Sequence, residues 1–265
     1  MTVTLIISTY NRPDALRLCV LSALNQTHLP DQIVIGDDGS TAETAEAVKE
    51  LQASSTVPIT YVWQPDEGFQ LAKIRNRSVA ASTGEYIIQV DGDIILGRRF
   101  VADHVALARP GVMLRGRRVC LTDKRSRRLC AEGRLPRLGV FSCGIEKRRL
   151  NALHLMPAAR WLAPRYRKHR AGIMGCNMSF WRKDFDDVNG YDENFVGWGC
   201  EDSDLATRME MNGVGKMDIK FAATAWHLHH GHPHMENLAS NQARNRRERT
   251  AAEVLSPKGL DQYLP

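Results

Sequence analysis

Hydrophobic and polar positions follow two alternating patterns in the first half of the chain. Short apolar runs rich in β-branched residues predict buried strands at 3–8, 32–40, 59–63 and 85–90. Between them, apolar residues recur at helical spacing and predict helices at 13–26, 42–53 and 70–82. Strands that alternate with helices form a mainly parallel sheet with helices on both faces. We therefore expect an α/β fold, whose ligands collect beyond the carboxyl ends of the strands.

The second half of the chain has a weaker pattern. Residues 122–170 show no clear period, and order returns at 172–181. A helix is predicted at 201–213, where it ends at Gly213, and a strand or strand end at 221–230. The tail from about residue 237 is polar and rich in arginine, so no fixed structure is predicted for it.

Composition narrows the class of protein. The chain has 265 residues, of which 43% are hydrophobic and 25% charged, as in ordinary globular domains. It lacks an apolar run of about 18 residues, so no membrane-spanning helix is expected. The first residues indicate a buried strand instead of a signal peptide. The six scattered cysteines indicate reduced thiols in a cytoplasmic protein.

Charge is unevenly distributed. Residues 115–170 contain 17 Lys and Arg against three acids, a net +14, which leaves −8 for the rest of a chain whose total is +6. Such a segment is either a solvated surface or a surface attracted to anionic phospholipid. Nucleic acid is not expected as a partner, because no recognised binding motif accompanies the charge.

An acidic turn follows the strand predicted at 85–90. Asp91 and Asp93 flank Gly92, which frees the backbone between them. Two carboxylates at this spacing can hold a divalent cation and a ribose hydroxyl side by side. An acidic turn that merely closes the strand is an equally good interpretation of these three residues alone.

Three histidines occur within four residues near the end of the chain. In an extended strand, His227 and His229 project to one face and His230 to the other. If the chain turns instead, His227 and His230 can pair. Further histidines at 232 and 234 leave a solvated loop as an alternative, but together with the acidic turn the cluster favours a shared metal site.

Residues 196–204 combine an aromatic ring, glycines and acids. Trp198 stands between Gly197 and Gly199, and Glu201 and Asp202 follow at the start of the predicted helix. Helix capping by the acids explains their position through the helix dipole, but it does not explain a ring between glycines. An exposed ring beside carboxylates suits a sugar, whose apolar face stacks while its hydroxyls bond to the acids.

In order along the chain, these motifs resemble those of family 2 glycosyltransferases. The matching stretches are Ser8 to Asn11, Asp37 to Ser40, Glu67 to Phe69 with Arg75 and Asn76, Asp91 to Asp93, and Gly197 to Asp202. The last stretch is similar to the C-terminal region of β-1,4-galactosyltransferases and bacterial chondroitin-polymerase-type domains. The resemblance covers residues 1–110 and 172–232, and the basic segment between them has no counterpart.

The resemblance implies a GT-A fold with a smaller C-terminal acceptor-side subregion. It further implies a nucleotide-diphosphate sugar donor, expected to be a UDP-sugar, a Mn²⁺ or Mg²⁺ ion, and inversion at the anomeric carbon. On this basis the chain is one catalytic domain in four parts. They are a nucleotide-sugar-binding half at 1–110, a basic variable insertion at 111–171, an acceptor-binding and metal-completing half at 172–236, and a polar tail at 237–265.

The matching motifs also imply roles for single residues on the donor side. Ser8 is expected to contact the donor, Tyr10 to stack on its base, and Asp38 to accept the imide N–H of that base. Arg75 is expected to face the diphosphate and Asp91 to meet the ribose.

On the metal and acceptor side, the resemblance implies that Asp93 and His227 bind the metal. For the second histidine, the strand argument places His229 above His230. Asp202 is the expected catalytic base, and Glu201 and Trp198 are expected to bind the acceptor sugar.

The basic segment and the family together predict a cellular setting. The acceptor is expected to be a cell-surface glycan or a lipid-linked sugar, in polysaccharide or lipopolysaccharide assembly. The enzyme is then cytoplasmic and peripheral on the inner face of the membrane. Two other classes compete: a nucleotidyltransferase, whose Gly-rich, Lys-containing phosphate loop is missing from this sequence, and a non-enzymatic module that binds anionic membranes or RNA.

Overall fold

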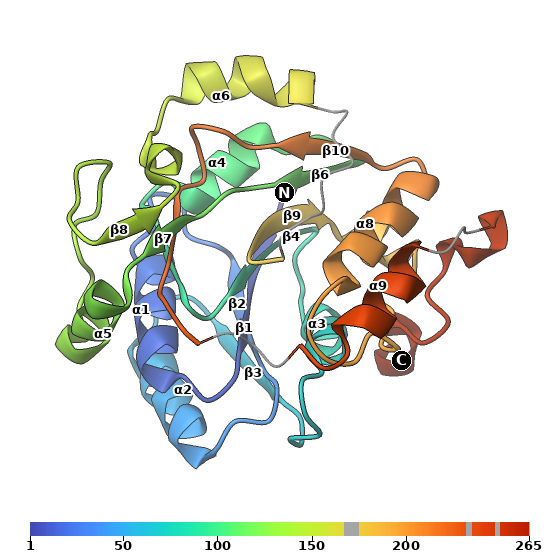
Figure 1. Cartoon of the computed structure of the whole chain (residues 1–265), viewed down its shortest axis with the longest axis horizontal. Coiled ribbons are helices and arrows are strands. Elements are labelled where there is room, and N and C mark those ends of the chain that lie inside the picture. The colour runs from blue at the N-terminus through green and yellow to red at the C-terminus, as the bar shows by residue number, and fades with distance from the viewer. Residues whose placement is uncertain (167–174, 232–234, 247–249, 265) are drawn as a thin grey trace.

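A seven-stranded sheet forms the centre of the computed structural model, which describes residues 1–166, 175–231, 235–246 and 250–264 (Figure 1). The strand order is β10-β6-β9-β4-β1-β2-β3. The strands are β1 (Val3–Thr9), β2 (Gln32–Asp37), β3 (Ile59–Trp63), β4 (Tyr86–Asp91), β6 (Val112–Arg115), β9 (Asn177–Trp181) and β10 (Gly215–Asp218). Only β9 runs antiparallel to its neighbours in this sheet. The predicted mainly parallel α/β fold is thereby confirmed.

Helices cover both faces of this sheet. One face packs against α1 (Pro13–Leu24), α2 (Ala42–Ser54) and α4 (Phe100–Leu107). The other packs against α3 (Leu71–Ala80), α7 (Arg182–Asp186) and α8 (Glu201–Met211). Leu5 and Ile7 of β1 enter the first core and Ile6 the second, because successive side chains of a strand point to opposite faces. Burial on both faces explains the continuous apolar run from Leu5 to Ile7 in β1.

A second, four-stranded sheet lies beside the first in the order β5-β11-β7-β8. Its strands are β5 (Ile94–Leu96), β11 (Ala225–His227), β7 (Val119–Leu121) and β8 (Ile145–Lys147). It packs on α1 and on α5 (Asp123–Glu132) through a small apolar core. Its antiparallel β5–β11 pair sets His227 opposite Ile94, and so joins parts of the chain more than 130 residues apart.

The basic segment is more closely integrated than the expected boundaries at 111 and 171 suggest. It supplies β6 to the central sheet and β7 to the second sheet. In place of an irregular stretch, α5 begins at the cap residue Thr122, whose side chain accepts from the Arg125 backbone, and ends at left-handed Gly133. The segment continues through η1 (Arg149–Ala152), α6 (Met156–Leu162) and η2 (Ala163–Tyr166). Within the described ranges, no helix is both long enough and apolar enough to cross a bilayer.

The described part of the C-terminal tail, for which the sequence pattern assigned no structure, contains three short helices. It forms α9 (Leu238–Arg246), η3 (Ala251–Val254) and η4 (Leu260–Tyr263). The side chain of Asn189 holds it by hydrogen bonds to both the backbone and the carboxylate of Asp261, at 2.8 and 2.9 Å. Leu260 is buried, and Tyr263 donates to Glu193. These contacts depend on distant parts of the chain and leave no periodic pattern in the tail itself.

Candidate functional site

The candidate site lies where β1 and β4 end side by side. In the sheet, β2 and β3 lie on one side of β1, and β4 lies on the other side. The loops that follow β1 and β4 therefore diverge at this edge of the sheet. Ser8 and Asp91 are register partners at these strand ends. The Ser8 hydroxyl is buried and has no hydrogen-bond partner among the described residues. This edge therefore offers polar groups that remain unsatisfied by the protein.

Asp93, His227 and His230 form a metal-binding arrangement beside these strand ends. One ligand atom from each lies within 4.8 Å of the others. The Nε2 atoms of His227 and His230 are 3.4 and 3.2 Å from Asp93 Oδ2. His227 is held there because it ends β11, and Leu228 N donates to the Asp93 carbonyl at 2.9 Å.

The structure reverses the expected order of the last two histidines. His229 Nδ1 lies 3.6 Å from Asp123, and its backbone N–H donates to Ser126. Because β11 stops at His227, the strand alternation that favoured His229 does not extend past it. The turn alternative, in which His227 pairs with His230, matches the geometry. The histidines at 232 and 234 lie outside the described residues.

The donor set fits a divalent transition metal. Asp93 Oδ1 is buried and lacks a hydrogen-bond partner in the described part of the chain. Burial, and next the positive charge of Arg118, lowers the pKa of His227 to about 3. This imidazole is therefore neutral at pH 7, with a lone pair available to a metal. One carboxylate and two imidazoles suit a divalent transition metal better than Mg²⁺ or Ca²⁺, which prefer all-oxygen sites.

Arg75 lies at the centre of a second cluster, with three carboxylates. Its guanidinium is 2.7 Å from Asp202, 3.1 Å from Asp91 and 3.2 Å from Glu201. The side chain is only 1% exposed. Arg75 was expected to face the donor diphosphate, but here its NH1 and NH2 groups are engaged by protein carboxylates. The structure instead gives it the position of an internal counter-ion.

The Asp202 carboxylate is oriented from three directions. Its Oδ1 accepts from Arg75 and from the hydroxyl of Tyr191, at 3.1 Å, and its Oδ2 accepts from Gly175 N at 2.7 Å. A side chain at position 175 would collide with Asp202 and Arg75, so glycine is required there. Burial raises the pKa of Asp202 despite the lowering effect of Arg75. A raised pKa makes this carboxylate a stronger base.

Glu201 occupies the buried side of the same cluster. Burial, and secondarily the charge of Asp202, raises the pKa of Glu201 to about 7, against the lowering effect of Arg75. Its Oε2 has no hydrogen-bond partner among the described residues. The pair that opens α8 therefore contains one well-oriented carboxylate and one with an unsatisfied oxygen.

The Trp198 loop owes its glycines to backbone conformation. Gly197 and Gly199 have φ values of 80° and 101°, which favour glycine. A side chain at position 197 would collide with the side chain of Asn237. The backbone N–H of Gly197 donates to the Phe69 carbonyl at 2.9 Å. At Gly197 the backbone therefore lies close to the Asn237 side chain of the protein itself. Trp198 remains 40% exposed.

The expected donor side presents two exposed rings. Tyr10 donates its hydroxyl to Asp66 at 2.9 Å, and Trp63 donates its indole N–H to the Ser40 carbonyl at 3.2 Å. Both rings are nearly half exposed. Their hydrogen bonds fix the rings at their polar atoms and leave the apolar faces open to a ligand.

Asp38 lies below this edge and is buried. It accepts from Gln64 Nε2 at 2.6 Å and from Gln70 N at 2.8 Å. Burial raises its pKa to about 6, although both hydrogen bonds lower it. Each oxygen has a second lone pair that an imide N–H can use.

Sequence reasoning missed several residues of the site. Arg12 NH1 lies 3.6 Å from Asp93, and Arg118 is near enough for its charge to act on Asp91, Asp93 and His227. Arg12 directly follows a motif that was singled out, so its position was a usable signal. Arg118 stands within the basic segment, where nothing distinguishes it from its neighbours.

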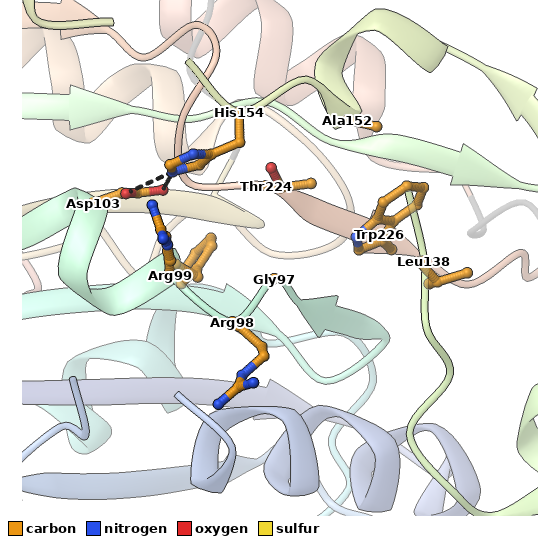
Figure 2. Close-up of a pocket in the computed structure, with 10 residues that line it drawn as sticks. Gly97, Arg98, Arg99, Asp103, Leu138, Ala152, His154, Thr224 and Trp226 are labelled. Carbon is orange, nitrogen blue, oxygen red and sulfur yellow. Dashed lines mark hydrogen bonds and ion pairs between the residues drawn. The ribbon is translucent and has the colours of Figure 1, made fainter. Parts of the chain in front are cut away.

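A cavity of about 300 Å³ lies apart from both clusters (Figure 2). It begins at Gly97, at the opposite end of β5 from Asp93, and contains none of the predicted site residues. Figure 2 shows His154 bonded to Asp103, whose carboxylate also accepts from Ala223 N at 2.7 Å. The cavity separates the basic segment from α4, and the Asp103 contacts join the two.

Comparison with protein families finds two matches along the chain. Residues 4–129 match the model described as glycosyl transferase family 2. Residues 158–232 match the model described as the N-terminal domain of galactosyltransferase. The first match contains Asp91 and Asp93, and the second contains Asp202, His227 and His230.

Curated relatives are similar over different lengths. Validoxylamine A glucosyltransferase from Streptomyces hygroscopicus subsp. limoneus is 26% identical over 260 residues, which cover 89% of this chain and 54% of that protein. Chondroitin synthase from Escherichia coli is 31% identical over 105 residues, 39% of this chain and 15% of that protein. The chain thus spans just over half the length of the glucosyltransferase.

Solved structures share the fold. The mannosyltransferase PcManGT from Pyrobaculum calidifontis, in complex with GDP-Man and Mn²⁺, superposes with a TM-score of 0.64 at 19% identity. That match covers 96% of this chain and 67% of the other. GalNAc-T7 with UDP, GalNAc and Mn²⁺ gives 0.64 at 16% identity, over 92% and 48% of the two chains. These similarities establish the GT-A fold.

Proposed function

Because residues 4–129 match the glycosyltransferase family 2 model, we propose that this chain transfers a sugar from a UDP-sugar to a sugar hydroxyl with inversion at the anomeric carbon. One observation carries the proposal. The Asp93–His227–His230 arrangement and the oriented Asp202 lie beside one another, linked through Asp91 and Arg75 at the same strand ends. The metal site for the leaving diphosphate and the base for the acceptor hydroxyl can therefore act on the same donor sugar.

Asp93, His227 and His230 are the proposed ligands of the divalent ion. When bound there, the ion neutralises charge that develops on the leaving diphosphate. Two imidazole donors favour Mn²⁺ over Mg²⁺, which prefers oxygen ligands. The complexes of PcManGT and GalNAc-T7 with Mn²⁺ support the same choice.

Asp202 is the proposed general base. The acceptor hydroxyl gives its proton to this carboxylate as it attacks the anomeric carbon, on the face opposite the leaving diphosphate. Tyr191, Gly175 N and Arg75 fix the direction of the carboxylate, so little reorganisation accompanies the reaction. A single displacement converts an α-linked donor into a β-glycoside.

The donor nucleotide is proposed to bind between the exposed rings and the strand ends. Tyr10 stacks on the base, Asp38 accepts its imide N–H, and Asp91 with Ser8 meets the ribose. The unsatisfied Ser8 hydroxyl supports this assignment. For Arg75 we replace the diphosphate contact with a positioning role, in which it holds Asp91 and Asp202 at fixed separation.

The acceptor is proposed to be a glycan or a lipid-linked sugar of cell-surface polysaccharide or lipopolysaccharide assembly. Trp198 stacks on its apolar face, and Glu201 binds a hydroxyl next to the reacting one. The basic charge of residues 115–170 supports work at the cytoplasmic face of an anionic membrane.

Turnover of a panel of UDP-sugars tests the proposal. Hydrolysis or transfer should require Mn²⁺, stop with chelator and resume with added metal. NMR of the product should show a β-linkage from an α-linked donor. Asp202→Asn should bind UDP with Mn²⁺ as the wild type does, while transfer is lost. The proposal fails if neither turnover nor metal-dependent UDP binding is seen with any donor.

A further inference from the structure

Four large apolar side chains are exposed within a short stretch of the basic segment. Phe141 is 92% exposed, Leu150 69%, Leu155 52% and Trp161 60%. Single exposed apolar residues are ordinary on protein surfaces, but a group of them marks a surface for interaction. None of these side chains belongs to the proposed site for sugar transfer.

The backbone segments that carry the first two of these side chains are held together by hydrogen bonds. Arg149 NH1 donates to the carbonyls of Val140 and Ser142, at 2.7 and 3.1 Å, and so holds the loop around Phe141 against the turn that carries Leu150. Leu155 and Trp161 continue the stretch into α6, which lies along the outer edge of the molecule at the top of Figure 1.

The segment is anchored to the protein body at three points. His154 bonds to buried Asp103 at 3.0 Å, as Figure 2 shows. Asn151 Nδ2 donates to the Arg118 carbonyl at 2.9 Å, and Leu155 N donates to the Phe221 carbonyl at 2.8 Å. The apolar side chains are therefore presented on a fixed scaffold, and their exposure persists in the folded protein.

Positive charge accompanies the apolar side chains. Residues 141–161 contain Lys147, Arg148, Arg149 and Arg160, all exposed, and Glu146 as their one acid. Apolar side chains beside Lys and Arg are typical of surfaces that lie in a membrane interface, where the cations meet lipid phosphates. A second copy of this chain is a poor fit, because two such surfaces would place like charges face to face.

We propose that residues 141–161 are a membrane-docking surface, on which Phe141, Leu150 and Trp161 enter the acyl boundary of an anionic bilayer. Lys147 and its basic neighbours contact the lipid phosphates around them. Apolar insertion adds a component that salt does not screen, so this surface differs from the purely electrostatic contact that charge alone predicts. Docking does not depend on sugar transfer.

Cys143 provides a direct probe of insertion. It is the exposed one among the six cysteines, all of which the structure describes, and it is two residues from Phe141. An environment-sensitive fluorophore on this thiol should shift to the blue with vesicles of equal parts phosphatidylcholine and phosphatidylglycerol, and the shift should persist in part at high salt. Phosphatidylcholine alone should give little change.

Matched variants separate insertion from charge. Serine at Phe141, Leu150 and Trp161 together should lower vesicle partitioning by about tenfold or more, because each loses its apolar transfer energy. Serine at Leu29 and Leu255, which are exposed elsewhere, should not. All variants should keep their circular dichroism and their melting-temperature gain with UDP and Mn²⁺, so a failure of docking is distinct from a failure of the proposed function.

Three outcomes would overturn the proposal. In the first, the triple serine variant partitions like the wild type while Lys147→Glu with Arg160→Glu abolishes binding, so the contact is electrostatic only. In the second, the wild-type fluorophore shows no shift with anionic vesicles. In the third, analytical ultracentrifugation shows a dimer that the triple variant disrupts, which assigns the surface to a second copy.

Discussion

Two carboxylate clusters meet at the ends of β1 and β4, and they are balanced differently. Arg75 is buried among Asp91, Glu201 and Asp202, with all three within 3.2 Å. Around Asp93 the corresponding groups are two histidines and Arg12, which lies 3.6 Å away, and one carboxylate oxygen is unsatisfied by the described residues. Asp91 and Asp93 are two residues apart and belong to different clusters.

The difference separates what the protein orients by itself from what it leaves to a ligand. The Arg75 cluster carries its own cation, so Asp202 is held in place before any substrate arrives. The Asp93 cluster carries metal-ligating atoms, and a metal cation from solution is needed to balance its negative charge. We infer that the base is preorganised, while retention of the donor depends on the metal. The predictions below test that division.

The largest effect is expected from removal of the internal cation. Arg75→Met leaves buried Glu201 and the partly buried Asp202 and Asp91 without a counter-ion, and should lower the free energy of unfolding by about 3–5 kcal/mol, measured by urea denaturation. Arg12→Met is the matched change in the other cluster, and it should cost about 1 kcal/mol or less. Equal losses for the two variants would contradict the division.

Removal of the base should reduce turnover without loss of the donor. Asp202→Asn should lower kcat by about 10²- to 10⁴-fold, because the acceptor hydroxyl loses its proton acceptor. The Kd for UDP in saturating Mn²⁺, measured by calorimetry, should change little. A decrease in kcat below tenfold would assign the base to another residue.

Asp38 extends the comparison to a buried carboxylate with neutral donors only. Its pKa is about 6 in the folded protein against 3.8 ordinarily, because of burial, so the folded state binds its proton more tightly. Stability from this group is fully present below pH 4 and is lost as pH rises through 6. The unfolding free energy of Asp38→Asn relative to wild type should therefore rise between pH 4 and 7, by at most about 3 kcal/mol.

Urea denaturation of both proteins at a series of pH values measures this difference. A flat difference would show that Asp38 keeps an ordinary pKa.

The smallest effect distinguishes the two neighbouring histidines. His230→Ala removes one of three proposed ligand atoms and should weaken Mn²⁺ binding by about tenfold or more, measured by electron paramagnetic resonance. His229→Ala should leave the affinity within about twofold, because its ring lies at Asp123. The reverse result would restore the order that strand alternation favoured.

The fold was largely predictable from sequence where local pattern and burial agree. Among the strands of the first half, β1, β2 and β4 are buried on both faces, which makes them visible as apolar runs. α5 escaped prediction because only Ser126 and Leu129 are buried on it, and its ends are set by the caps Thr122 and Gly133. The ordered tail escaped for a similar reason, since Asn189 holds it through polar contacts.

The site was predictable as a set of residues but not as a set of contacts. Motif order assigned Asp91, Asp93 and Asp202 to one site, and in the structure Asp91 and Asp202 contact the same guanidinium, that of Arg75. The choice between His229 and His230 depended on where β11 stops, which the pairing with β5 decides. That Arg75 is enclosed by carboxylates depends on the approach of α8 to α3, which no local pattern encodes.

The hydrogen-bonded strands β8, β7 and β11 set the distance between the membrane-docking surface and the proposed metal site. Lys147 of the docking surface is the register partner of Cys120, and Cys120 is the partner of His227. Two strand spacings of about 4.8 Å therefore separate a proposed lipid contact from a proposed metal ligand. Once docked, the sheet would act as a spacer that fixes the height of the reaction above the headgroups. Acceptors whose reactive hydroxyl stands at that height would then be favoured by their length, in addition to the contacts made by Trp198 and Glu201.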